Sequence, residues 1–406
     1  MSGIDGIENP SQSTTLRQQL PGGTDQLASP PFRIVDVHGR RMTTQFIQMA
    51  RSVYRHDKHW IPPLTSAARK FMSPHRNPYF AEANADHFLA LDADGHPIGR
   101  ISASIDHRYV TTFSPTGFFG WFECINDQAI ASALLRRAES WVADRGLRRI
   151  AGPYSYCSTQ EFGLLTAGFD STPAAFQAHN PPYYQNLIEG AGYHRAYGTD
   201  VYQWSAQTDA EVLRSIADRG CRAQEAFGLQ VRHLDPRAWD TEMDLLYELF
   251  LASFSNNHDV VPISRPVFDD QVKELRAFFD PDLTFFVERD GLPVGFGLLI
   301  ADANEVLAAA DGRLTLDFLI RFKALRAAVT GAVVLMIGAR PDAVGSGVGR
   351  VLAGVVARIA LGEVGSYARV HTTWIHQDNW QSRALVAGTG AQPRRSYAIF
   401  ERELGR

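Results

Sequence analysis

Residues 344–350, Val-Gly-Ser-Gly-Val-Gly-Arg, have the composition of a loop that binds an anion through its backbone. Gly345, Gly347 and Gly349 permit positive φ and close approach of the main chain, so successive N–H groups can point at one anion. An apolar segment precedes the loop and a helix-forming segment follows it, so the helix N-terminus adds partial positive charge. Arg350, in the first helical turn, can reach a phosphate. The pattern predicts a diphosphate site at the end of a buried strand.

This glycine-rich turn has alternative roles that the sequence leaves open. Such turns between a strand and a helix also serve chain geometry alone. The loop lacks the Gly-Lys-Ser/Thr of a Walker nucleotide site. A dinucleotide-binding fold has its glycine fingerprint in the first βαβ unit, whereas this loop comes late in the chain. The two common nucleotide motifs therefore fit poorly.

The chain repeats itself, and the repeat places the loop inside a larger unit. Residues 88–106 and 284–302 both read as strand, tight turn and strand, with Asp-Gly-x-Pro-aliphatic-Gly in each. Three further pairs of segments recur in the same order, namely 32–41 with 229–238, 41–54 with 238–254, and 179–193 with 378–391. Four matches at spacings of 196 to 199 residues predict two copies of one fold.

The repeat also defines the predicted organisation of the chain. We expect a flexible tail over 1–31, one copy over 32–205, a linker helix over 206–227 and a second copy over 228–406. Within each copy the pattern predicts strand, helix, hairpin, strand, helix, strand, helix and strand. This order is typical of an α/β fold in which a mixed sheet carries helices on both faces.

The segments around the loop resemble motifs of the GNAT N-acetyltransferase superfamily. The strand 333–341, the loop and the helix 347–361 resemble motif A, whose final glycine pair is Gly-Val-Gly at 347–349. The helix from Asn379 to Gly390 resembles the next motif. Because the repeat covers both halves, the protein resembles a tandem GNAT, a group that includes mycothiol synthase and the Fem-type aminoacyl transferases. The resemblance implies two GNAT-like domains, each a mixed, mostly antiparallel sheet flanked by helices.

The resemblance further implies the donor and the residues that hold it. The donor would be acyl-CoA, or an acyl group on the phosphopantetheine of an acyl carrier protein. The pantetheine would run along the backbone of Ile337 and Ala339, with Asn379 on its other side. The diphosphate would lie on the loop, which consists of Val344, Gly345, Ser346, Gly347, Val348, Gly349 and Arg350. Two residues depart from the motifs: Val344 replaces a Gln or Arg, and Val386 stands where a tyrosine often protonates the leaving thiolate.

The first copy lacks the loop. Its strand 117–123 leads into a helical segment without a glycine cluster, and Glu123 and Asp127 would place negative charge where a diphosphate binds. We therefore expect only the second copy to bind the donor, and the first to act as a scaffold or as a wall of the acceptor site. The long aromatic segment 152–184 has little periodicity and is the predicted wall.

Three side chains are candidates for proton transfer, because acylation of an amine requires its ammonium group to lose a proton. His376 lies three residues before Asn379, His258 lies in the loop after the first helix of the second copy, and Tyr397 lies in the final strand. For each, the alternative is a solvated or structurally bonded side chain. Juxtaposition of the two reactants can also supply much of the rate without a dedicated base.

The composition of the chain limits the classes of partner that we expect. With a net charge of −4 the chain lacks the basic excess of nonspecific DNA or RNA binders, so we expect no DNA partner. It has no run of about 18 apolar residues, so we expect no membrane partner and a cytoplasmic protein. Cys124, Cys157 and Cys221 are far apart and no His/Cys cluster has the spacing of metal ligands, so we expect free thiols and no metal.

The sequence thus predicts an N-acyltransferase that moves an acyl group from acyl-CoA or a carrier protein to the amine of a small molecule, as in specialised metabolism. One alternative is Fem-like transfer from aminoacyl-tRNA, which the acidic charge and the diphosphate loop disfavour. Another is a non-catalytic ligand-binding protein on a decayed GNAT fold, which the missing tyrosine favours. O-acylation and thioester decarboxylation are also open, because a fold does not determine the reaction.

Overall fold

The computed structural model describes residues 31–156, 161–254 and 261–405 of the chain. His258 and Cys157, two residues considered from the sequence, lie outside these ranges, as does the predicted tail up to residue 30. Within the described ranges, every helix is too short or too polar to cross a membrane.

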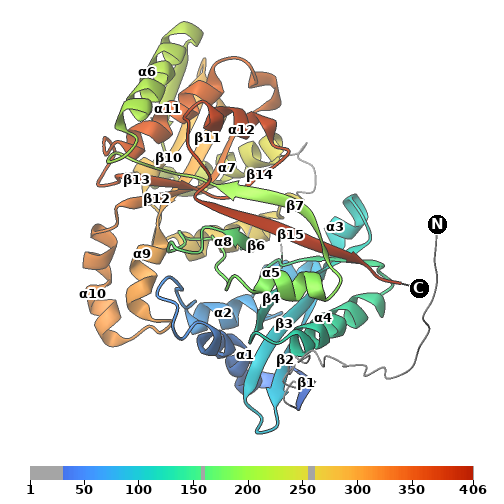
Figure 1. Cartoon of the computed structure of the whole chain (residues 1–406). Coiled ribbons are helices and arrows are strands. Elements are labelled where there is room, and N and C mark those ends of the chain that lie inside the picture. Colours follow the sequence, from blue (N-terminus) through green and yellow to red (C-terminus); the bar gives the residue numbers. More distant parts are fainter. Residues whose placement is uncertain (1–30, 157–160, 255–260, 406) are drawn as a thin grey trace, which may run out of the picture.

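The first half follows the predicted order of elements (Figure 1). Its elements are β1 (Phe32–Asp36), α1 (Gly39–Val53), α2 (Thr65–Phe71), β2 (Ala83–Asp92), β3 (Pro97–Asp106), α3 (His107–Thr112), β4 (Thr116–Cys124), α4 (Gln128–Ala143), β5 (Arg149–Gly152), β6 (Leu164–Ala167), α5 (Tyr184–Gly190), β7 (His194–Val201) and β8 (Gln203–Ser205). The predicted linker helix is α6 (Ala210–Phe227), which ends at Gly228 in the left-handed region with φ of +62°.

The second half repeats this order with one insertion. Its elements are β9 (Leu229–His233), α7 (Trp239–Phe254), α8 (Arg265–Leu275), β10 (Thr284–Arg289), β11 (Leu292–Ala301), α9 (Ala303–Leu307), α10 (Leu316–Ala327), β12 (Gly331–Ala339), α11 (Val348–Ala360), β13 (Arg369–Thr372), β14 (Ile375–His376), α12 (Trp380–Ala387) and β15 (Arg395–Glu403). Between its hairpin and next strand the first half has only the short helix α3, so α10 is the inserted element.

The elements form two mixed sheets. The first has the order β1-β2-β3-β4-β5-β15-β7-β14, with β6 paired to β15, and the second has the order β8-β13-β12-β11-β10-β9. Neighbouring strands are antiparallel except for β4 with β5 and β12 with β13. The predicted fold class, an α/β protein with mixed and mostly antiparallel sheets flanked by helices, is confirmed.

The two sheets do not follow the predicted division at residues 206–227. The last strand, β15, lies in the first sheet between β5 and β7, and β8 forms an edge of the second sheet beside β13. The sequence repeat is preserved, but hydrogen-bond ladders rather than sequence order decide which sheet a strand joins. The second half therefore contributes β14 and β15 to the first sheet, and the first half contributes β8 to the second sheet. A boundary drawn through the linker does not separate the sheets.

Helices on the sheet faces supply most of the two cores. In the first half α4 buries Ile130, Leu134 and Ala138 completely. In the second half α11 packs on the sheet and α6 packs on α11. At their crossing, a Cβ on Gly220 would lie 2.8 Å from the Cα of Gly354, so both positions require glycine. The linker helix is thus pressed against the helix that follows the glycine loop.

Candidate active site

The glycine loop between β12 and α11 has a backbone suited to an anion. Gly345 and Gly347 both have φ of +85°, in the left-handed region that favours glycine. Gly347 is the N-cap of α11, and no side chain of the described residues caps the helix there. The N–H groups of the first turn therefore have no side-chain acceptor, which suits this helix end to a bound anion. These residues fit the diphosphate that the sequence predicts for them.

Two glycines of this loop have different surroundings. A Cβ on Gly347 would lie 2.5 Å from the ring of Phe227, at the end of α6. A Cβ on Gly349 would meet no atom within 4 Å. The loop is therefore closely packed against α6 at Gly347, whereas the space beside Gly349 is open. The open side is where a ligand has room.

The matching helix of the first half is capped by its own side chain. Asp127 precedes α4, and its Oδ1 accepts hydrogen bonds from the N–H groups of Ala129 at 2.9 Å and Ile130 at 3.1 Å. Its carboxylate occupies the position that an anionic ligand would take. This arrangement supports the prediction that only the second half binds the donor.

The strands next to the loop separate, as the predicted pantetheine site requires. β12 and β13 are paired only as far as Val334 and Thr372. β12 continues beside β11, with Ile337 opposite Gly297 and Ala339 opposite Gly295. The chain after β13 instead turns to β14, which pairs with β7 in the first sheet. The edge of β12 at Ile337 and Ala339 is thus not paired with β13 in the described structure.

Two predicted site residues lie between β14 and α12. Asn379 caps α12, and its Oδ1 accepts a hydrogen bond from the N–H of Ser382 at 3.0 Å. His376 Nδ1 accepts one from the N–H of Asp378 at 3.1 Å, and its ring centre lies 4.5 Å from that of Tyr197. Both side chains have structural partners. Their roles toward the donor and the proton remain predictions.

Tyr397, the third predicted acid or base, is buried in β15. Its hydroxyl donates to the carbonyl of Ala178 at 3.0 Å and accepts from Arg395 Nη1 at 3.0 Å. Burial raises the pKa of this phenol to about 12. The hydroxyl therefore anchors the segment around Ala178, and its predicted role in catalysis is not tested by this position.

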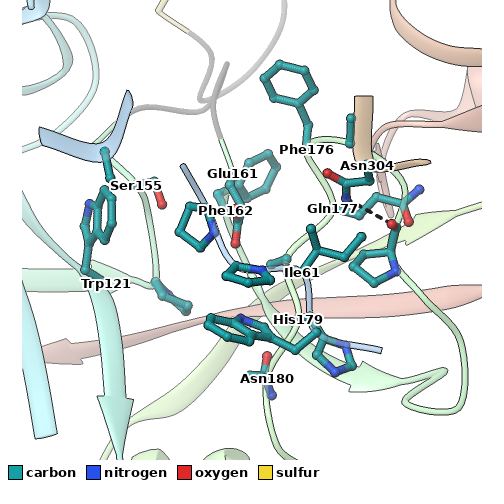
Figure 2. A pocket seen from close by; sticks show the side chains of 18 of the residues that line it. Ile61, Trp121, Ser155, Glu161, Phe162, Phe176, Gln177, His179, Asn180 and Asn304 are labelled. Carbon is teal, nitrogen blue, oxygen red and sulfur yellow. Dashed lines mark hydrogen bonds between the residues drawn. The ribbon is translucent and has the colours of Figure 1, made fainter. Parts of the chain in front are cut away.

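A cavity of about 570 Å³ lies between the two halves (Figure 2). The segment between α1 and α2, much of the predicted wall 152–184, and residues of α8 and α9 line it. Aromatic and aliphatic side chains predominate, among them Ile61, Leu64, Phe71, Phe162, Phe176 and Leu307. Cavities of this size and character are typical ligand sites.

Glu161 brings a carboxyl group into this apolar cavity. Its side chain is exposed to the cavity, and Figure 2 draws it among the aromatic and aliphatic groups of the wall. The protein around the cavity desolvates the carboxylate and the nearby charge of Glu123 repels it, so the pKa of Glu161 rises to about 7. A group with a pKa near neutral is suited to general-base catalysis. Sequence reasoning missed this residue, although a carboxylate in an aromatic, aperiodic segment was a usable signal.

Two contacts connect the cavity wall to the point where β12 and β13 separate. The ring centre of Phe162, next to Glu161, lies 4.3 Å from that of Trp374, which follows β13. Gln177 Nε2 donates to the carbonyl of Thr372 at 3.1 Å. The cavity and the predicted pantetheine path therefore meet at residues 372–374.

Both halves hold the wall segment in place. Asp302 accepts a hydrogen bond from the N–H of Ala175 at 2.9 Å, and burial raises the pKa of this carboxyl to about 6. Arg395 donates to the carbonyls of Ser171 and Ala178 and to Nδ1 of His179 at 2.7 Å. Because an arginine can only donate, His179 Nδ1 accepts, and its Nε2–H is left to donate to Asp57 at 2.7 Å. The orientation of His179 at the cavity wall is thereby determined.

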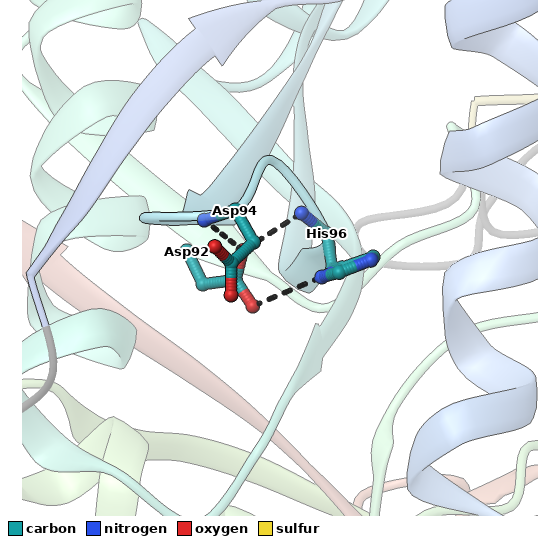
Figure 3. A group of neighbouring side chains, drawn as sticks. All are labelled: Asp92, Asp94 and His96. Atoms are coloured by element: carbon teal, nitrogen blue, oxygen red, sulfur yellow. Dashed lines mark hydrogen bonds and ion pairs between the residues drawn. The ribbon is translucent and has the colours of Figure 1, made fainter.

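A second cluster of titratable groups, Asp92, Asp94 and His96, lies in the turn between β2 and β3 (Figure 3). Asp92 Oδ1 accepts hydrogen bonds from the N–H groups of Asp94 at 3.0 Å and His96 at 2.8 Å. These bonds are those of a tight turn closed by an aspartate. The cluster is therefore accounted for by the structure of the turn.

Solved structures share this architecture over almost the whole chain. A tandem GNAT protein from the clavulanic acid biosynthesis pathway superposes with a TM-score of 0.55 at 12% identity, covering 93% of this chain and 99% of that one. The chain has the tandem GNAT fold. A GCN5-related glucosamine N-acetyltransferase region in a fungal multi-domain β-N-acetylglucosaminidase superposes with a TM-score of 0.53 at 12% identity, covering 95% of this chain and 40% of that one. The resemblance expected from motif A and the repeat is confirmed.

Two relatives by sequence also span both halves of the tandem GNAT fold. Protein YghO of Escherichia coli is 28% identical over 88% of this chain and 92% of its own length. The Bacterial ceramide synthase of Caulobacter vibrioides is 28% identical over 89% of this chain and 94% of its own. An aminoglycoside N(6′)-acetyltransferase of Stenotrophomonas maltophilia is 34% identical over 23% of this chain and 64% of its own. No protein-family model matches the chain. The fold and these relatives together support an N-acyltransferase.

Proposed function

We propose that this protein joins a fatty acyl group, supplied as a thioester of CoA or of a carrier protein, to the amine of a long-chain lipid. The relative named as a ceramide synthase supports this substrate class, because it matches nearly the full length of both chains. The aminoglycoside-modifying relative matches less than a quarter of this chain and carries less weight. A ceramide is the amide of a fatty acid and a long-chain amino alcohol, so both substrates would be lipids.

The cavity between the halves is the observation that carries the proposal. Its aromatic and aliphatic wall would exclude water from an alkyl chain, and each buried methylene stabilises binding by about 0.8 kcal/mol. A polar group at the same wall, the Glu161 carboxyl, would orient an amino alcohol at one end of that chain. A small polar amine would gain little from Phe71, Phe176 and Leu307.

Glu161 would take the proton that the ammonium group of the acceptor loses before it reacts. An alkyl amine is an ammonium ion at neutral pH and becomes a nucleophile only after it loses a proton. With a pKa of about 7, the Glu161 carboxylate is a sufficient acceptor. The amine nitrogen then attacks the thioester carbonyl, the C–N bond forms, and the C–S bond breaks with its electron pair leaving on the sulfur. The nitrogen loses a second proton as the amide forms, and this proton neutralises the thiolate to give the thiol.

The donor would lie on the second half. The first-turn amides of α11 and the loop 344–350 would hold the diphosphate, and Ile337 and Ala339 would bond the pantetheine. The thioester then supplies the activated acyl carbon beside residues 372–374, where the cavity wall meets the separated strands. Asn379 and His376, the residues with predicted roles toward the donor and the proton, lie at the same end of these strands.

Gly349→Glu tests the donor site without disturbing the fold. The new side chain would have open space, and an acidic residue in the first turn is favourable for a helix. Its charge would repel a diphosphate, so we expect calorimetry to show CoA affinity reduced at least about tenfold, which corresponds to about 1.4 kcal/mol. Gly349→Gln is the matched neutral control and should bind CoA nearly as well as the wild type.

A product assay tests the substrate class. Long-chain acyl-CoA or an acylated carrier protein is incubated with a long-chain amino alcohol, and the amide is detected by mass spectrometry. We expect amide formation by the wild type and its loss in Gly349→Glu. A protein that binds CoA but acylates only small polar amines would refute the lipid substrate. A protein that binds neither CoA nor a carrier-protein thioester would refute the donor.

A further inference from the structure

The inserted helix α10 presents an apolar surface to solvent, away from the residues of the candidate active site. Leu316, Leu319 and Ile320 are 75%, 56% and 73% exposed, and Leu314, two residues before the helix, is 51% exposed. On its other face α10 buries Phe318 in the core of the second half, with Phe322 and Leu325 packed against the same core. A surface helix normally pairs one apolar face with one polar face. Because α10 is apolar on both, its outer face is suited to a partner.

Basic side chains border this exposed face. Arg313, Arg321 and Lys323 are all exposed. Asp317 neutralises only Arg321, with which it forms an ion pair at 3.2 Å one helical turn apart. The face therefore combines leucine and isoleucine side chains with a positive border. This combination is typical of a helix that lies in the plane of an anionic membrane surface.

The start of α10 is fastened to the wall of the cavity. The Gly312 carbonyl accepts a hydrogen bond from the N–H of Thr65 at 3.0 Å, and Arg51 donates to Asp311 Oδ1 at 3.0 Å. Pro63 and Leu64, directly before Thr65, line the cavity. Figure 1 shows α10 at the edge of the molecule beside α9, whose Leu307 lines the same cavity. The segment that leads into α10 is therefore bonded to residues next to those that line the cavity.

We propose that α10 docks this protein on the surface of an anionic lipid bilayer. Leu316, Leu319 and Ile320 would enter the acyl-chain boundary, with Arg313 and Lys323 at the headgroups. A second copy of the chain is a poorer occupant, because two such faces would bring like charges together. The sequence-based expectation of no membrane partner considered spanning segments only, and a helix lying in the interface needs none. Docking goes beyond the proposed reaction, since it requires neither the thioester nor the amine.

Vesicle sedimentation with the full-length chain tests the proposal. The probes are vesicles of phosphatidylcholine alone and vesicles of phosphatidylcholine and phosphatidylglycerol in equal parts. We expect binding to the anionic vesicles and a reduction of at least about tenfold in the variant with Leu316→Ser, Leu319→Ser and Ile320→Ser, because those side chains supply the buried apolar area. The matched control carries Leu292→Ser and Leu385→Ser, which change side chains that are 69% and 50% exposed on other elements, and should bind like the wild type.

Charge and oligomeric state separate the remaining outcomes. Arg313→Gln with Lys323→Gln should weaken binding to anionic vesicles and leave the weaker binding to neutral vesicles unchanged. Thermal unfolding should be unaltered by these surface substitutions. The proposal would be overturned if the wild-type chain binds neither kind of vesicle, or if the triple serine variant binds vesicles as the wild type does. It would also be overturned if the wild-type chain forms a dimer without vesicles and the triple serine substitution converts this dimer to a monomer. Acylation of a detergent-solubilised long-chain amino alcohol by the triple variant would leave the proposed reaction standing whatever the vesicles show.

Discussion

Glu161→Gln should remove the proton acceptor of the cavity while keeping the size of the side chain. The pKa of about 7 implies that about a tenth of the wild-type carboxyl groups are ionised at pH 6 and about nine tenths at pH 8. We therefore expect kcat/KM to rise about tenfold over this range. Loss of a general base typically costs about 10²–10⁴ in rate, or about 3–5 kcal/mol, so kcat of Glu161→Gln should fall by this amount.

The assay follows thiol release and amide formation at saturating acyl-CoA from pH 6 to 8. Acceptors whose amines differ in pKa are compared, because a midpoint that belongs to Glu161 stays near 7 for all of them. Ser155→Ala, which changes another residue of the cavity wall, is the control and should keep the wild-type midpoint. If Glu161→Gln retains the wild-type kcat and pH profile, Glu161 is not the base.

The same carboxyl group makes a stability prediction of defined sign. Its pKa rises from about 4.5 in the unfolded chain to about 7 in the folded protein, so between these values the folded state binds more protons. The contribution of this carboxyl group to the free energy of unfolding is therefore fully present below pH 4.5 and is lost as the pH rises through 7. Glu161→Gln should raise Tm at pH 8 and change it little at pH 4. An equal Tm difference at both pH values would show that the carboxylate is not desolvated.

Three further substitutions address the neighbouring structure. His376→Ala should lower kcat without lowering CoA affinity if His376 is the base, and an unchanged kcat, measured in the same assay, would remove it from the candidates. Gly347→Ala should lower the free energy of unfolding in urea by about 1–3 kcal/mol, because a Cβ there meets Phe227 and φ is positive. This destabilisation should be smaller when Phe227→Ala is also present. An equal destabilisation in both backgrounds would contradict the contact between Gly347 and Phe227. Arg395→Met should leave the carbonyl of Ser171 without its donor, at about 1–3 kcal/mol, whereas the carbonyl of Ala178 keeps the Tyr397 hydroxyl. A variant as stable as the wild type would show that the Arg395 bonds are dispensable.

The local pattern of the sequence predicted the elements of the fold because each depends on nearby residues. Hydrophobic periodicity placed the helix after the loop at 347–361, and the structure has it at Val348–Ala360. The linker helix and both Asp-Gly hairpins were likewise predictable from turn chemistry and spacing. The strand predicted at 369–375 is instead interrupted after Thr372, where the chain passes from the second sheet to the first. That interruption depends on β7 and β8, which are distant in sequence.

The sequence by itself determined the tandem GNAT fold and the glycine loop of the second half, since a repeat and a strand–loop–helix are read from residues close in the chain. Only the tertiary structure decided that β15 joins the first sheet, because strand pairing over such separations has no local signature. Only the tertiary structure places Glu161 in a cavity lined by residues from both halves. The desolvation that raises its pKa comes from these surrounding residues and not from its neighbours in sequence. The exposed apolar face of α10 could not be predicted from the sequence either, because an apolar helical pattern does not reveal which of its two faces the core will cover.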